Sequence, residues 1–447
     1  MAKTSACLPK MATNHMYITT LSRSAYLLHK WIALQGGSQS LASVSYHHYL
    51  SSSSDHRFPE ADDDHDVELI AALEHPDRVH RVDLNITNSG AEEVFAVMQV
   101  PFPVLTHLEL IGYVNVPVLP GGFLGGSAPC LQHLRIEEVS FPDLPTLLLS
   151  ARDLVSLRLN CGYISPESMV VGLAELTRLR TLSFVAQPPF PPPEQTRRRP
   201  DPPMLAVLPA LTQFVFAGDS EYLEDLVAQI DTPRVDDVRI QYFMEEEEAQ
   251  TPHLSQFIGR LANLKLAQFG RAQIIFHDDN VDNVCIELDR PQGGRRQAHL
   301  SITILDGGVD FLVPYVVHDA ILSNMGQLSV RRAQVEFGRQ DDVDRTEWLP
   351  LFHLFPAVET MHVSRSMAGY ISSALEDIAE EMVTEVLPAL HLLCLEDDDN
   401  YDYDSDNIKP VGSTERFLSL RQISGRPVTI VNTRHDFVGK LKAHRTC

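Results

Sequence analysis

The sequence predicts an α/β fold in which strand-plus-helix repeats stack into a solenoid with one curved parallel sheet. The first observation behind this prediction is a phrase, L-x-x-L-x-L, which occurs at Leu105–Leu110 and again 26 residues later at Leu131–Ile136. The second is that copies of the phrase continue on both sides at nearly constant intervals. Because one strand and one helix cannot bury their apolar faces alone, such units gain a shared core by stacking.

Seven copies keep this register, at intervals of 26, 26, 23, 25, 32 and 24 residues. They begin at Val79, Leu105, Leu131, Leu154, Leu179, Leu211 and Val235. A period of about 20–29 residues is typical of leucine-rich repeats. The ninth places of three repeats hold Tyr113, Val139 and Gly162 rather than the asparagine or cysteine of standard repeats. We therefore expect an irregular leucine-rich-repeat solenoid.

Residues 1–60 are predicted to be a weakly ordered, basic and serine-rich tail. Residues 1–54 contain four Lys or Arg side chains and no acidic residue. Organelle transit peptides also lack acidic residues, but they are richer in arginine. We therefore favour a tail with one short helix over Leu27–Leu34.

Residues 61–250 are predicted to be the regular repeat array. Its first helix follows Asp62–Asp64, since acidic side chains stabilise a helix N-terminus through the helix dipole. Return helices with one apolar face are expected at Pro142–Ala151, Pro166–Leu176 and Glu221–Ile230. The interval of 32 residues is explained by an insertion, residues 188–203, which holds eight prolines. We expect this insertion to run extended on the surface; alternatively, it docks into an aromatic groove of a partner domain.

Residues 251–435 are predicted to contain irregular repeats and a C-terminal cap, with a tail over residues 436–447. Val284–Leu288 and His299–Leu305 are expected to be strands of a hairpin that turns at Gly293-Gly294. Further copies of the phrase are expected at Leu264–Phe269, Val358–Val363 and Leu390–Leu395.

The predicted cap closes the array at its C-terminal end. It consists of a helix over Ser413–Leu420 and a strand over Val428–Val431. Terminal repeats of solenoids need such caps because their outer face would otherwise expose the shared core to water.

The balance of charge excludes several classes of partner. The chain carries 60 Asp and Glu against 36 Lys and Arg, a net charge of −24. Proteins that bind phosphate normally neutralise it with Lys and Arg, so we expect neither nucleic acid nor a membrane as partner. No run of 18 apolar residues predicts a membrane span. The six cysteines occur without C-x-x-C, which favours a reducing compartment, the cytoplasm or the nucleus.

No active-site motif is recognisable, so we expect neither enzymatic activity nor a cofactor. The sequence contains no G-x-S-x-G, H-E-x-x-H, Walker or dinucleotide-binding fingerprint. The acidic run Glu396–Asp406 lacks the glycine and the glutamate that a calcium-binding loop requires. His107 beside His133 could share a metal ion, but we expect no metal site. An unrecognised hydrolase, with its residues on separate repeats, is the remaining alternative.

The predicted repeats do supply a binding surface. In each phrase the leucines point inward, so strand alternation sends the third, fifth and seventh positions onto the concave sheet face. The candidate partner-binding residues on this face are Asp83, His107, Glu109, His133, Arg135, Glu137, Arg158, Asn160, Ser183 and Arg239. Asp83, Glu109, Arg135, Arg158 and Ser183 are expected to share one row, which suits a protein ligand with charges of its own. Alternatively, neighbours such as Glu109 and Arg135 pair only with each other.

Four segments within about residues 60–432 carry a family resemblance, namely Ile70–Val79, Pro101–Leu110, Leu226–Pro233 and Phe417–Ile430. They resemble the leucine-rich-repeat portion of the F-box-type proteins of mushroom-forming fungi. The resemblance implies that the repeats hold a protein target and that an N-terminal F-box docks a Skp-type linker and a cullin-type ubiquitin ligase. The F-box opening Leu-Pro-x-Glu has no match here, since Leu8-Pro9-Lys10 is followed by Met11.

These observations together predict a non-enzymatic protein-protein interaction solenoid. The resemblance implies a substrate-recognition receptor for ubiquitination. The missing F-box phrase favours the alternative, a free-standing scaffold or decoy binding protein without ligase contact.

Overall fold

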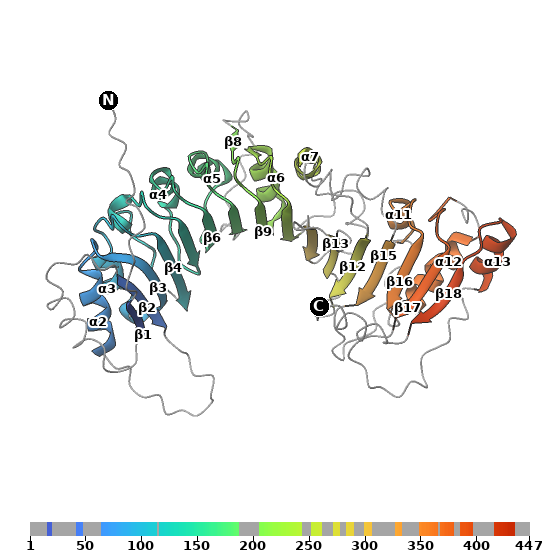
Figure 1. Cartoon of the computed structure of the whole chain (residues 1–447), viewed down its shortest axis with the longest axis horizontal. Coiled ribbons are helices and arrows are strands. Elements are labelled where there is room, and N and C mark those ends of the chain that lie inside the picture. Colours follow the sequence, from blue (N-terminus) through green and yellow to red (C-terminus); the bar gives the residue numbers. More distant parts are fainter. Residues whose placement is uncertain are drawn as a thin grey trace, which may run out of the picture. The chain divides into compact units, whose positions relative to one another are not determined.

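The computed structural model describes a mixed α/β chain whose strands lie in long sheets with helices beside them (Figure 1). The described residues are 16–19, 42–47, 64–113, 116–186, 205–243, 252–261, 271–277, 283–289, 299–305, 327–332, 348–364, 367–379, 385–396 and 415–433. The chain divides into two compact units. Unit 1 comprises Met1–Gly218 and Asp225–Pro233, and unit 2 comprises Asp219–Glu224 and Arg234–Cys447.

The strands that unit 1 contributes to the main sheet follow chain order and are all parallel. They are β1 (Met16–Thr19), β2 (Ala42–His47), β3 (Val79–Thr87), β4 (His107–Tyr113), β5 (His133–Glu137), β6 (Ser156–Cys161), β7 (Thr181–Ala186) and β9 (Gln213–Asp219), whose last residue is assigned to unit 2. The first six copies of the phrase coincide with β3, β4, β5, β6, β7 and β9. The parallel repeat that the sequence predicts is therefore confirmed for this part of the chain.

Helical segments alternate with these strands and lie along one face of the sheet (Figure 1). They are α2 (Asp64–Leu73), α3 (Asn88–Val97), the 3₁₀ helix η1 (Phe123–Gly126), α4 (Leu144–Ser150) and α5 (Pro166–Leu173). A small parallel pair, β8 (Ala206–Val207) with β10 (Ile230–Asp231), stands apart from the main sheet, and α6 (Ser220–Ala228) precedes β10. Parallel neighbours require such crossovers, since a tight turn cannot join them.

The core of unit 1 is a ladder of the inward positions of the phrase. Leu108, Leu134, Leu157 and Leu182 occupy equivalent places in four neighbouring strands, and each is at most 1% exposed. Each strand thus continues the apolar layer of the one before it, which is the physical basis of the constant interval.

Two described strands lie within residues 1–60, where the sequence predicts a tail. Strand β2 pairs with β3, and β1 pairs with β2. Both extend the parallel sheet by the same rule as the later strands. Neither strand was predicted, although Leu41-Ala-Ser-Val44-Ser-Tyr46 has the spacing of the phrase and Val44 of β2 stands in register with Val82 of β3. The helix expected over Leu27–Leu34 lies outside the described residues, as do the insertion 188–203 and the tail 436–447.

Unit 2 contains β11 (Asp237–Phe243), β12 (Arg271–His277), β13 (Asn283–Asp289), β14 (His299–Leu305), β15 (Gln327–Arg332), β16 (Thr360–Ser364), β17 (Leu392–Glu396) and β18 (Thr429–Thr433). Their spatial order is β11-β14-β13-β12-β15-β16-β17-β18. The predicted hairpin of β13 and β14 is confirmed, since these strands pair antiparallel. The expected copy at Leu264–Phe269 lies outside the described residues.

The helices described wholly within unit 2 are α7 (Pro252–Arg260), α11 (Trp348–His353), α12 (Ala368–Ala379) and α13 (Glu415–Ile423). The buried Glu224 side chain stabilises the start of α7, because its two oxygens accept hydrogen bonds from the backbone N–H groups of His253 and Leu254, both at 2.8 Å. The helix and the strand that the sequence predicts for the C-terminal end are present as α13 and β18, with β18 parallel to β17.

Candidate interaction surface

The sheet of unit 1 has one face that no described helix covers, which we call the outward face (Figure 1). It consists of the third, fifth and seventh positions of the phrase. From β3 to β9, every side chain at these positions is partly or fully exposed, whereas the intervening positions are buried. The alternation places a continuous, accessible surface opposite the core.

The register confirms the predicted middle row of this face. Asp83 pairs with Glu109, Glu109 with Arg135, Arg135 with Arg158, and Arg158 with Ser183. Val215 of β9 continues the row beyond Ser183. The flanking rows are Arg81, His107, His133, Ser156, Thr181 and Gln213 on one side, and Asn85, Ile111, Glu137, Asn160, Val185 and Ala217 on the other.

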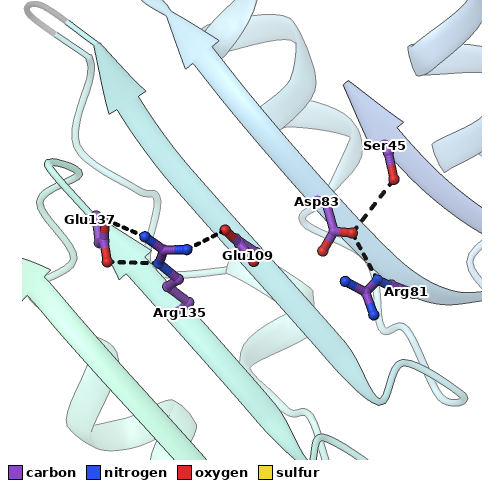
Figure 2. Close-up of polar contacts among 6 residues, drawn as sticks. All are labelled: Ser45, Arg81, Asp83, Glu109, Arg135 and Glu137. Atoms are coloured by element: carbon purple, nitrogen blue, oxygen red, sulfur yellow. Dashed lines mark hydrogen bonds and ion pairs between the residues drawn. The ribbon is translucent and has the colours of Figure 1, made fainter. Parts of the chain in front are cut away.

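Arg135 is held between two carboxylates, as Figure 2 shows. Its Nη1 donates to Glu109 Oε1 at 2.7 Å, while Nε and Nη2 donate to the two oxygens of Glu137 at 2.7 and 2.9 Å. The hydrogen bond to Glu137, together with the charge of Glu109, raises the pKa of Arg135 above its usual value. Glu109 and Arg135 therefore do pair with each other, and Arg135 is bonded to Glu137 as well.

A second ion pair lies one strand away. Arg81 Nε donates to Asp83 Oδ2 at 2.7 Å, and the Ser45 hydroxyl of β2 lies 3.5 Å from the same oxygen (Figure 2). Arg81 and Asp83 are two residues apart on one strand, so their side chains project from the same face. Strand β2 thus contributes to the charged part of the surface, although the sequence did not predict it.

His107 and His133 lie side by side on β4 and β5. Their rings are stacked, with centroids 4.3 Å apart and an angle of 16° between the planes. Burial, with the nearby His133 and Arg81, lowers the pKa of His107 to about 4. Burial and Arg81 also lower the pKa of His133 below its usual value. Both rings are therefore neutral at pH 7, and they add aromatic surface rather than charge.

The remaining unit 1 candidates lie on β6 and β7. Arg158 is exposed and has neither an ion pair nor a hydrogen-bond partner for its side chain among the described residues. Asn160 donates from Nδ2 to Glu138 Oε1 at 2.6 Å, and Ser183 is half-buried beside Arg158. Sequence reasoning missed Val185, Val215 and Ala217, which occupy outward positions of β7 and β9. The register of the phrase could have found them.

The tenth candidate, Arg239, belongs to unit 2. On β11 it forms an ion pair with Asp237, with Nε 3.1 Å from Oδ1. The outward face of unit 1 therefore holds the other nine candidates.

Among the described residues, no cluster of side chains fits a metal ion, and the pair of His362 and Glu396 has no nucleophile bonded to it. No three His, Cys, Asp or Glu side chains in the described part of the chain could hold a metal ion together. On unit 2, His362 Nδ1 lies 2.7 Å from Glu396 Oε1, with Ser329 and Cys394 at paired positions of the adjacent strands. Neither neighbour forms a hydrogen bond with His362, and burial raises the pKa of the Cys394 thiol. An activated nucleophile would need such a bond and a lowered pKa.

The comparisons with known proteins add little to this geometry. No protein-family model matches the chain, and no curated protein sequence matches it. Among solved structures, the leucine-rich repeat-containing protein LegL7 from Legionella pneumophila is similar over 81% of this chain and 95% of its own, at 12% identity and a TM-score of 0.28. So low a score carries no argument, and the repeat architecture rests on the strand register itself. No helix in the described residues is long and apolar enough to cross a membrane.

Proposed function

We propose that the chain is a non-enzymatic protein-protein interaction solenoid that binds a protein on the outward face of unit 1. One observation carries the proposal. From β3 to β9 the outward positions form three uninterrupted rows of accessible polar and small apolar side chains, with no described helix over them. A mixed surface of this kind offers both hydrogen-bonding groups and apolar contact to another protein.

The proposal is tested by placing a large charged side chain on each face of unit 1. Val215→Arg changes the outward face, and Val171→Arg changes α5, where the valine is 53% exposed. Affinity purification of the full chain from cells that express it should recover a specific set of proteins. Val215→Arg should lose that set and Val171→Arg should keep it. Equal recovery by both variants would mean that the partner binds elsewhere.

The substrate-receptor form of the proposal rests on the resemblance to fungal F-box-type proteins. It predicts that a Skp-type linker or a cullin copurifies with the wild-type chain. Recovery of a target without either component would support the second form, a free-standing scaffold or decoy.

The non-enzymatic part of the proposal is supported by the contacts of His362, Glu396, Ser329 and Cys394, which we call the His362 cluster. Because neither Ser329 nor Cys394 is hydrogen-bonded to His362, the cluster lacks the arrangement that would generate a nucleophile. We expect no hydrolysis of activated ester or peptide substrates above background. Hydrolysis that His362→Ala abolishes would favour a hydrolase instead.

A further inference from the structure

The charges on the outward face are divided unequally between its strands. On β3 to β5, the ionised side chains of Arg81, Asp83, Glu109, Arg135 and Glu137 form ion pairs with one another. A partner that used these groups would have to replace existing bonds, and the gain would be small. On β6, Arg158 is exposed and, among the described residues, has no partner for its guanidinium. It is thus ready to form a new ion pair.

The strands next to Arg158 offer a neutral, small-residue surface. The outward positions of β7 and β9 hold Thr181, Ser183, Val185, Gln213, Val215 and Ala217, all partly exposed and none charged. We call Arg158 together with these six residues the Arg158 patch. Since parallel strands lie about 4.8 Å apart, Arg158 and Val215 are separated by about 10 Å across the patch.

This arrangement selects the chemistry of the partner. A guanidinium recognises a carboxylate through two parallel hydrogen bonds and stays charged at any physiological pH. Covering the valine and alanine side chains with an apolar group removes apolar surface from water and lowers the free energy of the complex. An extended segment advances about 3.3 Å per residue, so a distance of about 10 Å corresponds to roughly three residues. A carboxylate and an apolar side chain two or three residues apart would therefore reach both parts of the patch.

Polyanions fit the patch less well. Phosphate groups are normally recognised by clusters of Arg and by helix N-termini, and nucleic acid by several cations in a row. The patch contains one arginine, in a chain with a net charge of −24. At physiological salt the Debye length is about 8 Å, so this overall charge does not prevent a single local ion pair.

We infer that the Arg158 patch binds an acidic-apolar segment of a protein partner, in which Asp or Glu contacts Arg158 and an apolar side chain covers Val215. This inference deepens the proposed function and rests on it. The proposed function requires only that some protein binds the outward face, whereas the inference specifies where on that face and with which chemistry.

The experiment is selection of random dodecapeptides displayed on phage against the full chain. The enriched peptides are then synthesised with a fluorophore and titrated by fluorescence anisotropy. We expect Asp or Glu to be enriched two or three residues from Val, Leu, Ile or Phe. Arg158→Gln should weaken binding by about 10-fold or more, because a charge-assisted hydrogen bond is lost.

Arg152→Gln is the matched control, since Arg152 follows α4 outside the sheet and its loss changes net charge equally. It should alter affinity by less than about twofold. Circular dichroism of both variants checks that they fold.

The outcomes separate the inference from the proposed function. Peptides that respond to Val215→Arg but not to Arg158→Gln would overturn the acidic partner and leave the outward face as the binding site. Peptides that respond to neither variant would count against both. Enriched sequences without acidic residues, or no enrichment at all, would overturn the inference.

Discussion

Unit 1 and unit 2 differ in what their sheets expose on the side opposite the buried leucine ladder. In unit 1, from β3 to β9, all side chains at these positions are at least partly exposed. Among the described residues of unit 2, six equivalent positions are buried, and they hold Gln273, Ile275, Cys285, Ser329, Ser364 and Cys394. Ser329 is only 1% exposed, between Gln273 and His362 of the neighbouring strands. A repeat that preserves its core thus does not by itself preserve an accessible surface opposite that core.

The strand connections differ as well. Every described strand pair of unit 1 is parallel, whereas β13 runs antiparallel to both β12 and β14. Five residues separate β12 from β13 and nine separate β13 from β14. A parallel crossover needs about a dozen residues, so these three strands can only form a meander. Strand β14 still pairs in parallel with β11, and β12 pairs in parallel with β15, so the sheet of unit 2 continues on both sides of the meander.

The largest effect is expected from the shared core of unit 1. Leu134→Ala removes a side chain that is 1% exposed in the middle of the ladder. We expect it to lower the free energy of unfolding by about 3 kcal/mol, because a cavity remains in the core. Leu149→Ala on α4, where the leucine is 40% exposed, is the control and should cost less than about 1 kcal/mol. Urea denaturation measures both, and equal losses would contradict the ladder.

In unit 2 we expect the next largest loss of stability from replacing a buried charged side chain. Arg421 of α13 is fully buried and donates from Nη2 to the backbone oxygens of Leu390 and Leu387, at 2.6 and 3.3 Å. Arg421→Ala should cost about 2 kcal/mol, since both carbonyls lose a charged donor. Hydrogen exchange should accelerate in residues 385–396 and not in β4 or β5. Gln422→Ala, at the exposed neighbouring position, should leave exchange unchanged.

A smaller effect is the pH dependence of the free energy of unfolding, to which His107 of the stacked histidine pair contributes. The folded pKa of His107, about 4, lies below its usual 6.5, so the unfolded state binds the proton first. The stability that this ring contributes is complete above about pH 6.5 and is lost as pH falls towards 4. Because the ring is half-buried and solvent screens it, we expect about 1–2 kcal/mol.

The test of this pH effect is urea denaturation at a series of pH values between 4 and 7. His107→Gln should flatten the curve in this window. His353→Gln, at an exposed position of α11, should leave the curve as in the wild type. A curve that His107→Gln does not alter would show that the ring titrates alike in both states.

The smallest expected effect is the difference in stability loss when each of the two arginines of the middle row is replaced. Arg135→Gln removes the ion pairs with Glu109 and Glu137 and should cost about 0.5–1 kcal/mol, because the pairs are partly exposed. Arg158→Gln should change stability by less than about 0.5 kcal/mol, since no bond is lost. Chemical denaturation of both variants gives the difference. A larger loss for Arg158→Gln would mean that Arg158 supports the fold and is not free for a partner.

Much of the outward face follows from the amino-acid sequence. Once the phrase is aligned, the alternation of strands places Asp83, Glu109, Arg135, Arg158 and Ser183 in one row without any knowledge of coordinates. The hairpin of β13 and β14 follows from two strand patterns around a pair of glycines. Strand β2 was not found in this way, because its phrase has Val44 and Tyr46 in place of leucine and begins 38 residues before that of β3, outside the period of the later repeats. Strand β1 is only four residues long and holds no complete phrase.

The sequence by itself determined the repeat, its core and the order of side chains along each row, because these depend on local periodicity. Only the tertiary structure decided which charges are already satisfied. Arg135 and Arg158 are indistinguishable by position, yet one is held between Glu109 and Glu137 while the other has no acceptor in the neutral strand beside it. Ion pairing depends on distances of a few ångströms between side chains of different strands, and periodicity does not specify such distances.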